Sequence, residues 1–204
     1  EQELMTKDAT IREIHHRVKN NLQTVSALLR LQSRRSSEDA VKVALAEAER
    51  RVQAIATVHA ALSQNVDESV DFDEVARTIV RMAGAIASTD HSVEVITTGS
   101  FGTIQADQAQ ALATVLNELV ANSVEHGLAE RDGLIEVRAV REGTSMTVTV
   151  ADDGVGFVPG TPMSGLGTQI VHQMVRGELK GSIEWTPREG GGTLVTLHAN
   201  LDPA

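Results

Sequence analysis

The sequence predicts an α+β protein in two parts: an N-terminal antiparallel helical hairpin over residues 1–65 and an α+β sandwich over residues 71–204, with a linker at 66–70. Two observations predict this division. All 16 glycines lie between Gly84 and Gly192, so the first part lacks a residue that weakens helices. The charge is also uneven, because the first 65 residues carry ten basic and eight acidic side chains whereas the rest carries eight and twenty.

The composition excludes several classes of protein. The chain has no cysteine, which rules out a disulfide framework and thiolate metal sites and fits a reducing cytoplasm. A net charge of −10 and an aromatic content of 2% argue against direct binding of nucleic acid. No apolar run approaches the roughly 18 residues that a membrane span needs, so we expect no membrane segment in this chain.

Two amphipathic helices are predicted in the first part. Between Leu4 and Leu31, apolar residues are spaced by threes and fours, as one stripe of a long helix requires. The stripe consists of Leu4, Ile11, Ile14, Val18, Leu22, Val25 and Leu29. Ser36, with Asp39 three residues later, resembles a capping box that opens a second helix. The stripe of that helix consists of Val41, Leu45, Ala48, Val52, Ile55, His59 and Leu62. One hairpin has too little surface to bury both stripes, so we expect a homodimeric four-helix bundle.

The second part alternates helices and strands. Three acidic residues from Asp71 onward start a helix that we expect to reach about Ala87. Another helix is expected over 107–126, with Gly127 as its left-handed C-cap. The remaining elements are expected as strands at 92–97, 135–140 and 146–151, a helix at 166–175, and closing strands at 182–186 and 193–198. This order favours a mixed sheet with its helices on one face.

The first helix carries a candidate nucleophile, His16. On a helical wheel this residue lies roughly 155° from the centre of the apolar stripe, so its side chain should face water. An exposed imidazole is partly neutral at pH 7 and can act as a nucleophile. His15 falls at the edge of the stripe instead. His59 lies on the stripe of the second helix, so we interpret it as a packed histidine without a catalytic role.

A second group of polar residues lies on the helix expected at 107–126. Glu118 and Asn122, four residues apart, share a face at the edge of its apolar stripe. A neutral amide oxygen suits a Mg²⁺ ion that takes most of its ligands from phosphates and water. A carboxylate beside it could accept a proton from an incoming nucleophile.

Two glycine clusters flank the strand and helix that follow. The first, Asp152-Asp153-Gly154-Val155-Gly156, comes directly after a strand, and the second, Ser164-Gly165-Leu166-Gly167, directly precedes a helix. Glycine allows close approach of the backbone to a ligand, and a helix N-terminus offers free N–H donors to phosphate oxygens. Together the clusters predict a nucleotide site. The sequence contains no Gly-Lys-Ser/Thr motif, so the site is not a Walker loop.

These residues resemble the motifs of bacterial sensor histidine kinases of the HisKA_2 group, close relatives of the HWE kinases. Residues 13–23, Glu-Ile-His-His-Arg-Val-Lys-Asn-Asn-Leu-Gln, resemble the phosphoacceptor box. Residues 117–126 resemble the N box and residues 152–156 the G1 box. Gly165-Leu166-Gly167 resembles the G2 box, and Gly192-Thr193 resembles a late Gly-Thr pair on a closing strand.

The resemblance implies a Bergerat-type ATP-binding fold after a hairpin for dimerisation and phosphotransfer. It implies that His16 accepts the phosphoryl group, that Asp152 binds the adenine amino group, that Asn122 binds Mg²⁺ and that Glu118 acts in catalysis. The other residues expected to contact the nucleotide are Asn117, His126, Gly154, Gly156, Gly165, Leu166, Gly167 and Thr193. The cofactors implied are ATP and Mg²⁺, and the partners are a second copy of the chain and a response regulator with an acceptor aspartate.

The sequence departs from the family pattern at two places. Arg17 follows the acceptor histidine, where the larger histidine kinase class has an acidic residue. Two carboxylates could take the proton in its place: Glu13, one turn before His16, or Glu118 from the other part. The segment 157–163 between the glycine boxes is short, which leaves little ATP lid.

We therefore expect an ATP-dependent histidine autokinase of a two-component system, forming the transmitter core of a longer cytoplasmic protein. Two alternatives keep the ATP fold. One is a serine kinase of the anti-sigma type, and the other is a dimeric scaffold that binds nucleotide without transferring phosphate.

Overall fold

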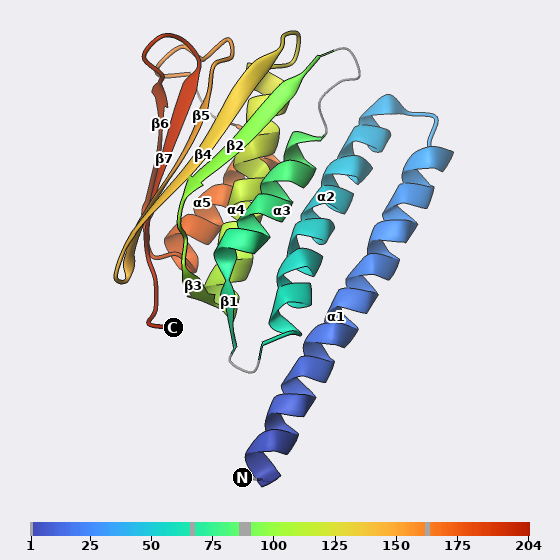
Figure 1. Ribbon diagram of the computed structural model, residues 1–204. Helices are drawn as coiled ribbons and strands as arrows, with labels where there is room; N and C mark the ends of the chain where they lie inside the picture. Colours follow the sequence, from blue (N-terminus) through green and yellow to red (C-terminus); the bar gives the residue numbers. More distant parts are fainter. Residues whose placement is uncertain (1, 66–67, 86–90, 162–163) are drawn as a thin grey trace.

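The computed structural model describes residues 2–65, 68–85, 91–161 and 164–204. The described elements form successive layers, which Figure 1 shows from left to right: a β-sheet, a layer of three helices, the helix α2 and the helix α1. The hairpin of α1 and α2 thus lies against the helical side of the second part, and the N-terminal end of α1 extends away from it.

The hairpin consists of α1 (Gln2–Arg35) and α2 (Asp39–Leu62), as the apolar spacing predicts. Between the helices, Gln53 donates a hydrogen bond to Ser26 over 2.7 Å, and Arg30 pairs with Glu49. The predicted capping box is wrong. Glu38 is the N-cap of α2 and makes no side-chain cap, while the Ser36 hydroxyl accepts from the Glu38 backbone N–H over 3.2 Å.

The two helices of the hairpin differ in how far a single chain buries their apolar residues. Ala54, Val58 and Leu62 of α2 are buried, and the last two belong to the main hydrophobic core. The core of the second part therefore supplies packing surface that we expected from a dimer alone. By contrast, Ile14 and Val25 of the predicted α1 stripe are exposed.

Five strands form a mixed sheet in the order β2-β4-β5-β7-β6. They are β2 (Val93–Gly99), β4 (Gly133–Glu142), β5 (Ser145–Asp152), β6 (Ser182–Pro187) and β7 (Thr193–Asn200). β2 pairs with β4 in parallel, and all other pairs in this sheet are antiparallel. The predicted mixed sheet is confirmed, and the strands expected at 135–140 and 146–151 form the antiparallel pair β4 and β5.

Three helices cover one face of this sheet, as predicted: α3 (Phe72–Gly84), α4 (Ala106–Asn122) and α5 (Leu166–Gly177) (Figure 1). Their apolar faces and the inner side of the sheet form one core. Asp71 caps α3 by accepting from the Asp73 backbone N–H over 3.1 Å, which agrees with the predicted acidic start. The predicted end of this helix near Ala87 lies outside the described residues.

Two short strands, β1 (Ser69–Asp71) and β3 (Thr103–Gln105), pair antiparallel next to α3 and α4. The sequence analysis did not predict them, because three residues are too few to show a period. β1 occupies part of the predicted linker, so the chain is already paired with the second part at Ser69.

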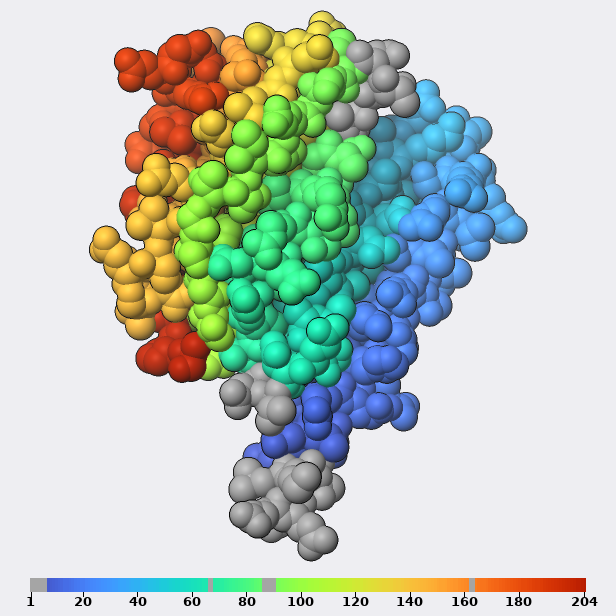
Figure 2. Space-filling view, viewed as in Figure 1, coloured from blue at the N-terminus to red at the C-terminus, as the bar shows by residue number. Residues whose placement is uncertain are grey.

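Apolar side chains remain on the outer side of the hairpin. Figure 2 shows α1, in blue, along the outer edge of the molecule. Among the hairpin residues whose exposure the structure describes, the exposed large apolar ones are Ile14, Val25, Leu28, Leu31, Val41 and Val43. Within the described residues, no helix combines the length and apolar composition that crossing a membrane requires.

Candidate functional site

A cavity of about 340 Å³ lies between the end of α4, the first turn of α5 and the ends of β5 and β7. Most of the residues that the sequence analysis assigned to a nucleotide site line this cavity. They are Glu118, Asn122, His126, Asp152, Gly156, Gly165, Leu166, Gly167 and Thr193. These residues come from four separate segments of the chain, and the fold brings them to one place.

Asp152, at the end of β5, is a buried acidic group of the cavity wall. Its residue is 3% exposed, and Oδ1 accepts hydrogen bonds from the backbone N–H groups of Gly154 over 3.0 Å and Thr193 over 3.3 Å. These bonds fix the plane of the carboxylate. The arrangement therefore presents an oriented acceptor to a ligand in the cavity.

Glycines crowd around Asp152 because side chains would not fit. A Cβ on Gly127 would lie 2.9 Å from Asp152 Oδ1, and one on Gly192 would lie 1.9 Å from the Asp152 carbonyl oxygen. A Cβ on Gly154 would lie 2.2 Å from the Gly127 carbonyl oxygen. The glycines predicted from the motif thus let three backbone segments converge on one carboxylate.

The end of α4 differs from the prediction. The helix does not run regularly to residue 126, because residues Ser123–Gly127 form a π-helical turn, η1. Gly127 also does not adopt a positive φ, so the predicted left-handed C-cap is wrong. The small size of Gly127 serves the contact with Asp152 instead. Such π turns occur frequently at functional sites, and this one carries His126 on the cavity wall.

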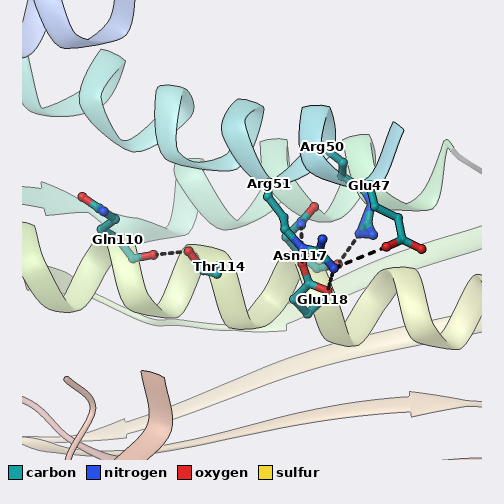
Figure 3. Close-up of polar contacts among 7 residues, drawn as sticks. All are labelled: Glu47, Arg50, Arg51, Gln110, Thr114, Asn117 and Glu118. Carbon is teal, nitrogen blue, oxygen red and sulfur yellow. Dashed lines mark hydrogen bonds and ion pairs between the residues drawn. The ribbon is translucent and has the colours of Figure 1, made fainter. Parts of the chain in front are cut away.

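Glu118 forms an ion pair with α2 (Figure 3). Its side chain is 2% exposed, and Arg51 donates to Oε1 from Nε over 2.7 Å and to Oε2 from Nη2 over 3.2 Å. The hydrogen bond to Glu118 raises the pKa of Arg51 above its ordinary value. This two-point contact joins the hairpin to the cavity.

Asn117 lies beneath this ion pair rather than on the cavity wall. It is 1% exposed, its Nδ2 donates to Glu118 Oε1 over 3.5 Å, and its carbonyl oxygen accepts from Arg50. Its Oδ1 has no hydrogen-bond partner among the described residues. The prediction that Asn117 contacts a nucleotide therefore finds no support in its position, and Gly154 likewise lies beside Asp152 without lining the cavity.

The two neighbouring histidines of α1 have different surroundings. His16 is exposed, and its Nδ1 lies 3.4 Å from Asn20 Nδ2. His15 is half-buried, and its Nδ1 lies 3.0 Å from the Nδ1 of His59 on α2. The wheel-based prediction that His16 faces water is confirmed, and His15, expected at the edge of the apolar stripe, lies against α2. His16 does not line the cavity.

The sequence analysis missed several residues of the cavity wall. Trp185 of β6 and Phe157 line it, as do Glu47, Arg50 and Arg51 of α2. Trp185 packs against His172 with ring centroids 5.3 Å apart. Its status as the only tryptophan of the chain is the one signal that could have drawn attention to it. Nothing in the local sequence indicates that α2 reaches the cavity.

Known families match both parts of the chain. Residues 13–86 match a family described as histidine kinase, HisKA_2, and residues 107–203 match the histidine kinase-, DNA gyrase B- and HSP90-like ATPases. The boundary between the two matches falls beyond the hairpin and before α4.

Curated relatives align with nearly the whole chain. The chain is 45% identical over 203 residues to the sensor histidine kinase PdtaS of Mycolicibacterium smegmatis, and 46% identical over 199 residues to PdtaS of Mycobacterium tuberculosis. These alignments cover 97% and 95% of this chain. The chain spans only 41% and 40% of the length of these relatives.

Solved structures with a similar fold include two of the blue-light activated histidine kinase of Erythrobacter litoralis. Its histidine kinase domain aligns with a TM-score of 0.61 at 24% identity, covering 98% of this chain and 95% of that one. The longer structure aligns with a TM-score of 0.67 at 25% identity, covering 94% of this chain and 59% of that one. With its hairpin, its ATPase-type sandwich and the two family matches, the chain belongs to the sensor histidine kinases of the HisKA_2 group.

Proposed function

We propose that the chain is an ATP-dependent histidine autokinase that phosphorylates His16 and passes the phosphoryl group to an aspartate of a response regulator. The observation that carries the proposal is the gathering of Asp152, Asn122 and the first turn of α5 around one cavity. The names of the mycobacterial relatives support it. In this proposal residues 1–65 form the phosphotransfer hairpin, 66–70 the linker and 71–204 the catalytic domain.

Asp152 suits the adenine end of the nucleotide. Because two backbone N–H groups hold Oδ1, the carboxylate is oriented before any ligand arrives. An exocyclic amino group can donate to such an oriented acceptor, whereas a carbonyl group in its place would be repelled. We therefore assign to Asp152 the selection of adenine over guanine.

Asn122 and the N-terminus of α5 suit the phosphates and their metal ion. Asn122 is half-buried on the cavity wall, and Gly165 to Gly167 open α5 there. No group of three or more acidic, histidine or cysteine side chains among the described residues could hold a metal ion. Mg²⁺ would therefore take one amide oxygen from Asn122 and the rest of its ligands from phosphates and water.

His16 would attack the γ-phosphorus of ATP, and the bond from that phosphorus to the bridging oxygen would break to release ADP. The proton of the imidazole goes to a carboxylate. Glu13 is paired with Arg17 over 2.8 Å, and Glu118 is paired with Arg51 over 2.7 Å. Glu13 contacts Arg17 through one oxygen and keeps the other, whereas Arg51 contacts both oxygens of Glu118 and must loosen this contact to free one.

Transfer requires a movement between the two parts. His15 packs against His59, and Arg51, at the cavity, precedes His59 by eight residues on α2. At 1.5 Å per residue the acceptor lies about 12 Å farther along the hairpin than the cavity. The part of the linker that precedes β1 would let the catalytic domain reach His16 of its own chain or of a second copy.

A second copy of the chain fits the exposed apolar side of α1. Ile14, Val25 and Leu28 lie within about 60° of one another on a helical wheel, and all three are exposed. An apolar stripe of this kind on a helix favours association. We therefore propose a homodimer in which the hairpins of two chains pack along these stripes.

Incubation with radiolabelled ATP tests the function directly. The parent protein should take up label, the His16→Gln variant should take up almost none, and the His15→Gln variant should retain labelling if its fold is intact. His198→Gln provides a matched control, because His198 is an exposed histidine at the far end of β7. Full labelling of His16→Gln would contradict His16 as the acceptor.

The chemistry of the product separates the alternatives. Phosphohistidine is lost in acid, whereas the phosphoserine of an anti-sigma-type kinase survives. A parent protein that binds ATP and takes up no label would be a non-catalytic scaffold. If the parent protein takes up label on histidine, transfer of that label to an aspartate of a purified response regulator tests the second step of the proposed reaction.

A further inference from the structure

Two arginines from the hairpin belong to the wall of the cavity. Arg50 and Arg51 are residues of α2, yet they line the cavity together with the catalytic domain. Among the described residues that line it, they are the only lysine or arginine side chains. The same wall carries four carboxylates, those of Glu47, Glu118, Glu125 and Asp152. Without α2 the cavity would offer no permanent side-chain cation to a polyphosphate.

Arg51 lies at the end of the cavity where α5 begins. Its Nη2 atom is 3.7 Å from the position that a Cβ on Gly167 would occupy. Gly167 is in the first turn of α5, whose free N–H groups favour phosphate oxygens. The guanidinium and the helix N-terminus therefore adjoin the same part of the cavity.

Arg51 is held by carboxylates in this structure. It contacts both oxygens of Glu118, and Glu47 lies 3.6 Å from its Nη2. The Arg51 side chain is 16% exposed, so a ligand in the cavity can still reach it. A guanidinium binds carboxylate and phosphate with the same planar set of donors, so a phosphate can compete for this side chain.

We propose that Arg51 is a phosphate-binding residue that the hairpin contributes to the ATP site. Arg51 exchanges its contact with Glu118 for the terminal phosphate when MgATP binds. The exchange weakens the hold on Glu118, which becomes available as a proton acceptor. This inference rests on the proposed ATP site, and it adds that nucleotide binding and docking of α2 are coupled.

A double-mutant cycle tests the direct contact. Loss of Arg51 alone would leave the buried Glu118 carboxylate unpaired, and this charge would repel a phosphate even if Arg51 never touched one. Glu118→Gln removes that charge. The decisive comparison is therefore Glu118→Gln against Arg51→Ala/Glu118→Gln, with affinities measured by isothermal titration calorimetry. The probes are the magnesium complexes of ADP and of the β,γ-imido analogue of ATP.

In the Glu118→Gln background, Arg51→Ala should lower the affinity for the ATP analogue about tenfold, as expected for loss of a charge-assisted hydrogen bond. The affinity for ADP should fall much less. Arg30→Ala is the matched control, because Arg30 also forms an ion pair with a glutamate of α2 but lies outside the cavity wall. It should leave both affinities unchanged.

Two results would overturn the proposal: no loss of analogue binding in the Glu118→Gln background, or an equal loss for ADP and the analogue. Because the readout is binding, failure of autophosphorylation does not affect it. A parent that binds both nucleotides and takes up no label would defeat the kinase function alone. A parent that binds neither nucleotide would defeat both proposals.

Discussion

The Nδ1 atoms of His15 and His59 lie 3.0 Å apart and join α1 to α2 one residue before the proposed phosphoacceptor. One ring must donate a proton and the other must accept it, so the pair requires at least one neutral imidazole. Burial lowers the pKa of His59, and His15 lowers it further. The stability of the hairpin should therefore depend on pH.

The sign of this dependence follows from the direction of the shift. In the unfolded chain His59 titrates near its ordinary pKa of about 6.5, and the folded chain binds the proton less readily. This contribution to stability is thus fully present above about pH 6.5 and is lost as the pH falls below it. Melting temperatures between pH 8 and 5.5 should fall less steeply for His59→Gln than for the parent. His198→Gln should keep the parental slope, and a parental slope for His59→Gln would contradict the prediction.

Substitution of Gly127 should disturb the end of the cavity that we propose for adenine. A methyl group there would press on the Asp152 carboxylate, which two backbone N–H groups already hold. We expect Gly127→Ala to lower the free energy of unfolding by about 1–3 kcal/mol, measured by urea denaturation. Gly177→Ala is the control, since no heavy atom lies within 4 Å of its added Cβ and its φ is not positive. Gly177→Ala should therefore keep the parental free energy of unfolding. Equal losses of this free energy in the two variants would refute the packing argument.

Asp152→Asn separates ligand binding from folding. The amide oxygen can still accept from the backbone N–H groups of Gly154 and Thr193, so the melting temperature should change little. Loss of the charged acceptor should lower the affinity for MgADP about tenfold, as measured by calorimetry. Asp153→Asn is the control, because Asp153 accepts from the Leu134 backbone N–H and does not line the cavity. Equal affinities for both variants would argue against adenine recognition by Asp152.

Leu28→Glu should separate the proposed dimer. This residue is 57% exposed in one chain, so the substitution removes little packing within that chain. In a dimer it would bury a carboxylate in an apolar interface, which is costly. Light scattering with size-exclusion chromatography should give the mass of a dimer for the parent and of a monomer for the variant. Lys42→Glu, a change at an exposed polar position of α2, should leave the mass unchanged.

The sequence determined the elements and the motifs because both depend on short-range spacing. Apolar periods of three to four residues located α1 and α2, and alternation located the strands of the main sheet. The glycine clusters marked the cavity because an added Cβ would meet Gly127 at Gly154, Gly192 at Gly156 and Glu118 at Gly167. The angular positions of His15 and His16 on one helix were enough to predict which of the two faces water.

Only the tertiary structure decided which segments meet. Arg51 and Glu118 are 67 residues apart, and no local pattern pairs an arginine on one helix with a glutamate on another. The π turn at residues 123–127 likewise arises where α4 must pass close to Asp152, so the interpretation of Gly127 as an ordinary C-cap was wrong. Spacing along the chain reports the shape of each element, whereas contacts between elements depend on how their surfaces pack, which spacing does not encode.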